Sequence, residues 1–190
     1  MTFVTIAATL YWTLLLALTA SSLAFAILAA RKPRHAWVAA GLLAIAVVMA
    51  SLGTQPVPTA VAVTLSLLCI ALAVAGGGPA VNLTLNLAGG SPTGEHGGIL
   101  VRTDGTATTA MPKHEVLRGG ATIGILERFA TAAAIMAGHP EAIAVIVALK
   151  GVGRFTELEA SEARERFIIG SLMSLIWACA SAVLWATALH

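Results

Sequence analysis

The sequence predicts an all-α integral membrane protein: a six-transmembrane-helix bundle with a short cytoplasmic loop region that can hold a small β-hairpin. Three observations predict it. Hydrophobic residues make up 58% of the 190 residues and charged residues 11%, and the mean hydropathy is +0.90, which is atypical of soluble domains. The charged residues gather in a few segments and leave long uncharged runs between them. Glycine and proline clusters divide these runs into lengths that suit membrane helices.

The first helix is expected over residues 3–30. Residues 1–30 contain no charged side chain, and the basic segment Arg31-Lys32-Pro33-Arg34 follows them. A secretory signal has its positive charge before a shorter apolar run, so this helix is expected to remain in the protein.

The second and third helices are expected over residues 37–52 and 59–75. No Asp, Glu, Lys or Arg occurs from residue 36 to residue 94, and residues 53–58 contain a glycine and two prolines. Such a cluster is typical of a turn and not of a helix interior. The segment Gly76-Gly77-Gly78-Pro79 is expected to end the third helix.

Residues 79–118 are predicted to form a cytoplasmic loop. Residues 81–87 alternate strictly between apolar and polar side chains, which is a strand pattern. Residues 99–102 can form a second short strand. Since a lone two-stranded hairpin is marginally stable in water, two alternatives remain. The loop is either a hairpin packed on the membrane domain or a partly disordered segment.

The last three spans are expected over residues 121–138, 140–155 and 167–188. In a rival interpretation, residues 121–155 form one helix kinked at Pro140, which gives five spans. Lys and Arg gather at 31–34, 102–118 and 150–166, and short loops rich in these residues lie in the cytoplasm. The charge pattern therefore favours a turn at Pro140 and places both termini outside the cytoplasm, with the chain in the plasma membrane.

A charged cluster lies in the fourth and fifth of these helices. A seven-residue repeat puts one glutamate in a stripe of small residues, on one helix face: Gly120, Gly124, Glu127, Thr131, Ala134 and Gly138. Because small residues mark close helix contacts in lipid, Glu127 is expected to face protein. Antiparallel neighbours would bring Lys150 or Arg154 to the Glu127 carboxylate, and Arg128 would turn to the headgroups or to a cytoplasmic helix at 157–166.

Two interpretations of this cluster, Glu127, Arg128, Lys150 and Arg154, stay open. It is either structural, as a salt bridge or a group reaching the headgroups, or it is a site for an ion, a proton or a substrate. Four further residues are predicted to serve helix packing: Gly120, Gly124, Gly170 and Ser174.

Three segments carry a resemblance: residues 121–128 (Ala-Thr-Ile-Gly-Ile-Leu-Glu-Arg), residues 148–158 with Lys150 and Arg154, and residues 165–170 (Glu-Arg-Phe-Ile-Ile-Gly). Together they resemble the C-terminal part of an uncharacterised family of bacterial multi-pass membrane proteins. The resemblance covers about residues 117–174. It implies a bacterial inner-membrane protein in which the four charged residues form one cluster, and it implies no reaction.

The sequence favours a non-catalytic subunit or scaffold that packs on a membrane partner. The alternative is a small ion- or proton-coupled transporter or channel that uses Glu127. No catalytic set, metal site or cofactor site is expected, because His114, His139 and His190 are far apart and Cys69 and Cys179 lie in apolar runs. The expected partners are the lipid bilayer and either a membrane protein or further copies of the chain. The net charge of +2 gives no reason to expect nucleic acid.

Overall fold

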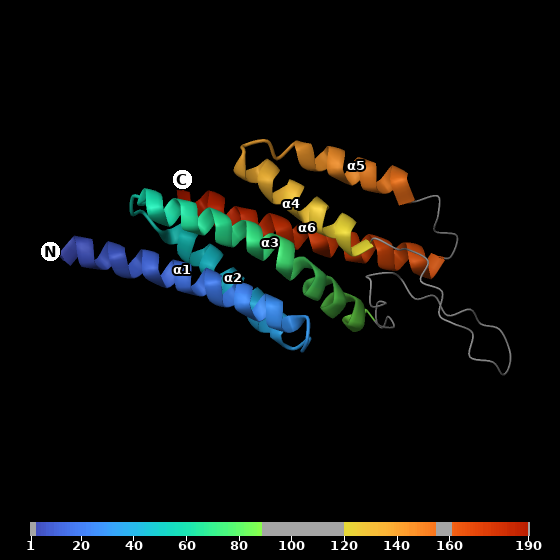
Figure 1. The fold of residues 1–190 in the computed structure, drawn as a ribbon, viewed down its shortest axis with the longest axis horizontal. Helices are drawn as coiled ribbons and strands as arrows, with labels where there is room; N and C mark the ends of the chain where they lie inside the picture. Colours follow the sequence, from blue (N-terminus) through green and yellow to red (C-terminus); the bar gives the residue numbers. More distant parts are fainter. Residues whose placement is uncertain (1–2, 89–119, 155–160, 190) are drawn as a thin grey trace.

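The computed structural model describes residues 3–88, 120–154 and 161–189, and these form six α-helices with no strand among them (Figure 1). In chain order the helices are α1 (Phe3–Ala29), α2 (His35–Leu52), α3 (Thr59–Leu87), α4 (Gly120–Met136), α5 (Ala142–Arg154) and α6 (Ser161–Leu189). The helix bundle predicted from the composition is confirmed.

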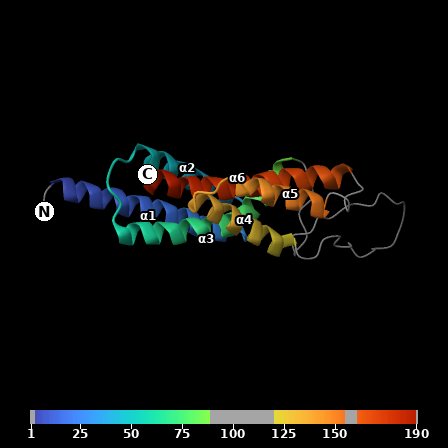
Figure 2. The same ribbon diagram turned by 90° about the horizontal axis from the view of Figure 1, so that it is seen from above.

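Successive helices run in opposite directions, so the bundle has two distinct ends. The α1–α2 turn, the end of α3 and the beginnings of α4 and α6 lie at one end. The N-terminal end of α1, the α2–α3 turn and the end of α6 lie toward the other (Figures 1 and 2). Helix α3 packs on α6 and α1, and α4 packs on both α3 and α6.

Four helices have the length and apolar composition of a membrane span. They cover Thr5–Ala29, His35–Leu52, Thr59–Leu87 and Arg164–Leu189. Their contact surfaces consist largely of alanine, leucine and glycine, so the helix backbones lie close together. These properties identify a membrane protein.

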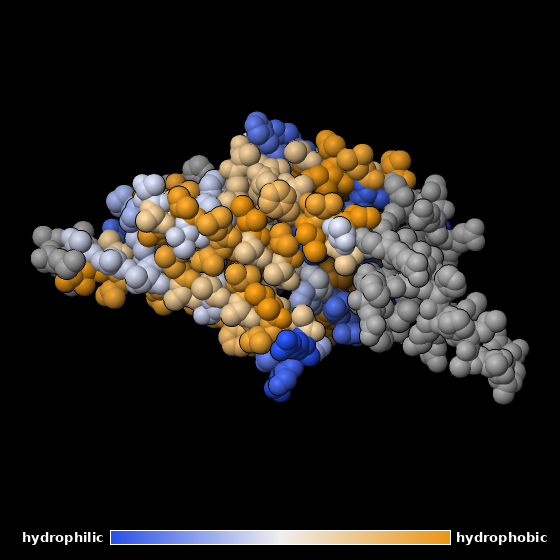
Figure 3. Space-filling model, in the orientation of Figure 1, coloured by the Kyte–Doolittle hydropathy of each residue, from blue (hydrophilic) through white to orange (hydrophobic). Residues whose placement is uncertain are grey.

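The outer surface of the bundle is apolar. Large hydrophobic side chains such as Leu10, Ile45, Leu67 and Ile176 are more than half exposed. Figure 3 shows hydrophobic residues over much of the visible face, with strongly hydrophilic residues near the α1–α2 turn, the α4–α5 turn and the ends of α3 and α5. A surface of this kind is stable against hydrocarbon and costly in water.

Helices α4 and α5 are shorter than the other four. They contain 17 and 13 residues, which corresponds to about 26 and 20 Å, whereas a hydrocarbon core is about 30 Å thick. The turn between them stops short of the end of the bundle where the α2–α3 turn lies (Figures 1 and 2). Of the six predicted spans, four therefore have spanning length, and α4 and α5 form a shorter hairpin against them.

The α4–α5 turn ends α4 in a Schellman motif. The Gly138 N–H donates to the Ile135 carbonyl at 3.0 Å and the His139 N–H to the Ala134 carbonyl at 2.8 Å. Gly138 has a φ of 81°, a conformation that glycine adopts without strain. The turn at Pro140 is confirmed, and the rival interpretation of one kinked helix over residues 121–155 is wrong.

The strand predicted over residues 81–87 is wrong, because α3 continues through Pro79 to Leu87. In this segment Leu85 is buried, and Val81 lies against Gly170 of α6. The packing of this segment as a helix outweighs its alternating pattern, which by itself favours a strand. The second predicted strand, at 99–102, lies outside the described residues. The predicted cytoplasmic helix and the last span form one continuous helix, α6, over the described residues from Ser161 onward.

A candidate functional site on helix α4

Helix α4 has three neighbouring helices, which lie on two sides of it. It contacts α5 on one side and α3 and α6 on the other (Figure 1). Glu127 and Arg128 lie at its middle, and adjacent residues in a helix point about 100° apart. The two charged side chains therefore serve two different interfaces.

Glu127 faces α5, where its carboxylate forms an ion pair with the Lys150 ammonium. The side chains of Lys150 and Glu127 are 17% and 11% exposed, so both charges are largely removed from solvent. Lys150 also lies over the Phe167 ring of α6, with its Nζ atom 5.7 Å from the ring centroid. The predicted pairing of Glu127 with Lys150 is confirmed. The Arg154 side chain lies outside the described part of the chain.

Arg128 faces α3 and α6 and is only 8% exposed. Its Nε donates a hydrogen bond to the Val74 carbonyl at 3.0 Å, and its Nη1 donates to the Ser174 hydroxyl at 3.2 Å. Val74 and Ser174 lie near the middles of α3 and α6. The prediction that Arg128 turns to the headgroups or to a cytoplasmic helix is wrong. It rested on depth measured along α4 alone, and it left out the longer helices that extend past α4.

A pair of glycines on α3 makes room for this arrangement. A Cβ atom on Gly77 would lie 2.2 Å from Arg128 Cδ, and one on Gly76 would lie 2.3 Å from the Trp177 ring. Trp177, from α6, donates its Nε1–H to the Leu72 carbonyl at 2.9 Å. Two large side chains from two helices thus lie directly on the α3 backbone. The sequence interpretation missed Gly76, Gly77 and Trp177 because it treated the glycines as the end of a helix. Adjacent small residues in an apolar run were the available signal.

Three of the four predicted packing residues lie in this region. A Cβ on Gly124 would be 3.1 Å from Arg128 Nη1, and a Cβ on Gly170 would be 3.2 Å from Val81 Cγ1. Ser174 accepts the hydrogen bond from Arg128. Gly120 is the first residue of α4 and is half-buried.

Thr131 follows Arg128 by three residues, close to one turn further along α4. It is fully buried, and its Oγ1 has no hydrogen-bond partner among the described residues. The adjacent Ala132 packs with Ala73 of α3 and with Ala178 of α6. This junction therefore holds one guanidinium, two hydroxyls and a lining of small apolar residues.

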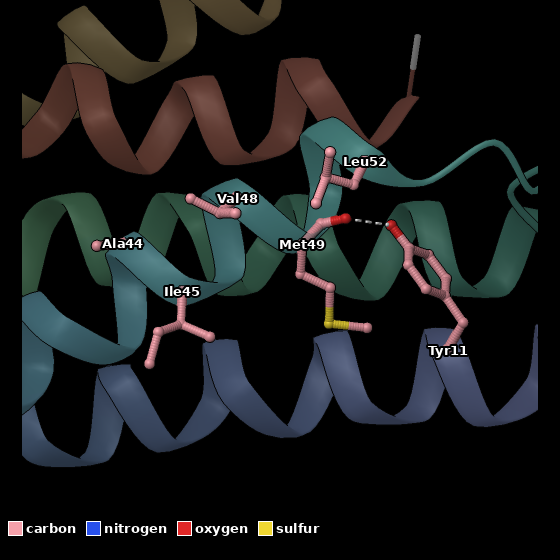
Figure 4. Close-up of a pocket in the computed structure, with 6 residues that line it drawn as sticks. All are labelled: Tyr11, Ala44, Ile45, Val48, Met49 and Leu52. Carbon is pink, nitrogen blue, oxygen red and sulfur yellow. Dashed lines mark hydrogen bonds between the residues drawn. The ribbon is translucent and has the colours of Figure 1, made fainter.

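Other described parts of the molecule contain fewer polar or charged groups that could bind a ligand. A groove of about 560 Å³ runs between α1 and α2, and its lining is almost wholly apolar: Tyr11, Ala44, Ile45, Val48, Met49 and Leu52 (Figure 4). The Tyr11 hydroxyl donates to the Met49 carbonyl at 3.1 Å. Within the described ranges, no group of three or more His, Cys, Asp or Glu side chains could hold a metal ion.

No family model matches the chain, and comparisons with curated proteins and with solved structures also found no match. The resemblance of residues 117–174 to bacterial multi-pass membrane proteins therefore stays a prediction. The assignment of the site rests on the geometry around α4.

Proposed function

We propose that this chain is a non-catalytic membrane subunit or scaffold, a helix bundle that packs on a membrane partner or on further copies of itself. The observation that carries the proposal is the ion pair between Glu127 and Lys150. A carboxylate that is already paired with a lysine from the next helix is suited to joining helices.

This pair acts where apolar packing is sparse. Helix α5 is short, it packs chiefly on α4, and the apolar side chains Val145, Leu149 and Val152 are more than half exposed. Few apolar contacts fix α5 in place, so the ion pair supplies a directional link between the two helices of the hairpin. This use of charge favours a structural role for the cluster.

The interior of the bundle supports the same proposal. Small side chains pack closely where α3, α4 and α6 meet, among them Ala73, Ala132, Ala178 and Ala182. Close contacts between small residues stabilise helix association in lipid, where no hydrophobic force between helices exists. A rigid bundle of this kind suits a protein that supports the assembly of others.

The alternative is a small transporter or channel in which Glu127 binds an ion or a proton. It is favoured by the burial of the Glu127 and Lys150 side chains, since ionisable groups inside a membrane often belong to transport pathways. In that case the lysine would have to leave the carboxylate during each cycle. The two functions differ in whether the position of the negative charge matters.

A charge-exchange experiment separates them. Glu127→Gln should weaken the assembly or its thermal stability, and the double variant Glu127→Lys with Lys150→Glu should restore both, since it keeps an ion pair between α4 and α5. The measurements are complex size after extraction in mild detergent, melting temperature, and proton or cation flux in proteoliposomes. Flux in the wild type that both variants abolish would instead support the transporter. An exchanged pair that fails to restore stability would remove the structural role of this ion pair.

We also propose that the chain lies in a bacterial inner membrane with both termini outside the cytoplasm and that α4 and α5 enter the bilayer as a pair, giving six membrane helices. The basic α1–α2 turn supports this orientation, because its end of the bundle would face the cytoplasm. Reporter fusions at positions 94 and 161 should report cytoplasm, and a fusion at Gln55 should report the exterior. An exterior report at position 161 would contradict the proposed topology.

A further inference from the structure

The turn between α1 and α2 carries three exposed basic side chains, Arg31, Lys32 and Arg34. None of the three forms an ion pair with another residue in the described part of the chain. The helices on either side of the turn supply no opposite charge, because the sequence contains no Asp or Glu before Glu95. The turn therefore presents three positive charges that no described carboxylate pairs with.

Backbone hydrogen bonds hold these side chains in a short, ordered turn. The N–H groups of Arg31 and Lys32 both donate to the Leu28 carbonyl at 3.0 Å. The His35 N–H donates to the Lys32 carbonyl, also at 3.0 Å, and Pro33 restricts the backbone between them. Helix α2 begins at His35 and adds the partial positive charge of its N-terminal end. The cations are consequently held close together, beside one helix end.

Exposed apolar side chains border the basic turn on both helices. Ile27 and Leu28 near the end of α1, and Trp37 and Val38 near the beginning of α2, are 43% to 59% exposed. Figure 3 shows hydrophobic residues next to the hydrophilic residues of this turn. Because both helices have the length and composition of membrane spans, the border faces hydrocarbon and the cations lie at the bilayer surface. A ligand that fits both parts has an anionic head attached to apolar chains.

We propose that the α1–α2 turn binds an anionic phospholipid in preference to a zwitterionic one, with Arg31, Lys32 and Arg34 at its phosphate headgroup and Trp37 beside its acyl chains. A zwitterionic headgroup carries its own cation and gains less from the basic side chains. A nucleic acid or an acidic peptide would meet the charges alone, whereas a lipid also covers the apolar border. The proposal does not depend on the subunit role or on which end of the bundle faces the cytoplasm.

The test uses the full chain in proteoliposomes of phosphatidylcholine and phosphatidylglycerol, with bromine on the acyl chains of one lipid or of the other. Bromine quenches tryptophan fluorescence on contact, and the difference between the wild type and Trp37→Phe gives the signal of Trp37. We expect phosphatidylglycerol to bind beside Trp37 about fivefold or more tightly than phosphatidylcholine, the ratio for one basic residue that contributes about 1 kcal/mol near an anionic surface.

The other tryptophans provide the internal control. Trp12 and Trp177 are buried, and Trp185 lies near the end of α6, toward the opposite end of the bundle. The fluorescence that remains in Trp37→Phe should therefore be quenched equally by the two brominated lipids.

Two variants locate the effect. The triple variant Arg31→Gln, Lys32→Gln and Arg34→Gln should abolish the preference, whereas Arg31→Lys with Arg34→Lys keeps the charge and should keep it. If the triple variant fails to assemble, the salt dependence of the wild type decides, since a preference based on exposed charges must fall as ionic strength rises.

Three results would overturn the proposal. The first is equal quenching of Trp37 by the two brominated lipids, and the second is a preference that survives in the triple variant or at high salt. The third is loss of the preference when inorganic phosphate is added at constant ionic strength, which would show that the turn binds a soluble anion instead.

Discussion

The two faces of α4 stabilise charge in different ways. On the face toward α5, Glu127 meets an opposite charge, Lys150, and the contact depends on that pairing. On the face toward α3 and α6, Arg128 meets a backbone carbonyl and a hydroxyl, and the contact depends on how closely glycine lets the backbone approach. The difference teaches that two neighbouring charges on one helix can be stabilised in different ways, one by an opposite charge and the other by close packing against backbone and a hydroxyl.

The two faces should therefore respond differently to substitution. An ion pair is most sensitive to the loss of one partner, because the other charge is left unpaired. A side chain packed against glycines is most sensitive to changes in volume. Four sets of variants separate these sensitivities, with unfolding in mixed micelles as the common measurement.

The largest effect is expected on the α3 and α6 face. Arg128→Ala should lower the free energy of unfolding by about 3 kcal/mol, because it leaves a cavity at the helix junction. Arg128→Met should cost about 1 kcal/mol, since it fills the space and removes the cost of burying the charge. Equal stability of Arg128→Ala and the wild type would show that the side chain lies at the membrane surface.

The α5 face should show the opposite pattern. Lys150→Met leaves the Glu127 carboxylate without its partner and should cost about 2 kcal/mol. Adding Glu127→Gln should recover part of that loss, since no unpaired charge then remains. A double variant that is less stable than Lys150→Met alone would contradict the pairing.

A change of one methyl group tests the shape dependence. Gly77→Ala should cost about 1.5 kcal/mol, because its Cβ would lie 2.2 Å from Arg128 Cδ. Gly78→Ala is the matched control, since its Cβ would meet nothing within 4 Å. The control should be neutral or up to about 1 kcal/mol more stable, as alanine favours helix. If both variants behave alike, the close approach of Arg128 is refuted.

The uncharged α1–α2 interface provides the smallest effect and a reference for both faces. The buried Ser22 hydroxyl donates to the Ala39 carbonyl across this interface at 2.8 Å. Ser22→Ala should cost about 0.6 kcal/mol, the usual value of one such hydrogen bond in a membrane protein. Ser51→Ala, whose exposed hydroxyl bonds within its own helix, should change the free energy of unfolding very little. A loss at Ser22 as large as that at Arg128 would remove the distinction between charged and uncharged contacts.

The sequence predicted the helical architecture well because its main signals are local. Uncharged runs and glycine–proline clusters place α1, α2 and the α4–α5 turn close to their observed positions. The pairing of Glu127 with Lys150 was also predictable, since a turn at Pro140 makes their depths along two antiparallel helices almost equal. Each of these inferences needs only the order of residues and the rise of a helix.

Arg128 and the end of α3 were not predictable in the same way. Their structure depends on contacts between segments more than 45 residues apart, such as Arg128 with Val74 and with Ser174. The alternating pattern of residues 81–87 does not reveal that this segment contacts α6. In the sequence, the glycines before Pro79 look like a helix end. In the structure, they make room for the Trp177 and Arg128 side chains.

Two double-mutant cycles test the central claim, that each face of α4 is an independent contact. One crosses Glu127→Gln with Lys150→Met, and the other crosses Arg128→Met with Ser174→Ala. We expect a coupling energy of about 1 kcal/mol or more within each cycle. A third cycle, Lys150→Met with Ser174→Ala, should give about zero, because these residues lie on opposite sides of α4. No coupling between Glu127 and Lys150, or a third cycle as large as the first two, would contradict the claim.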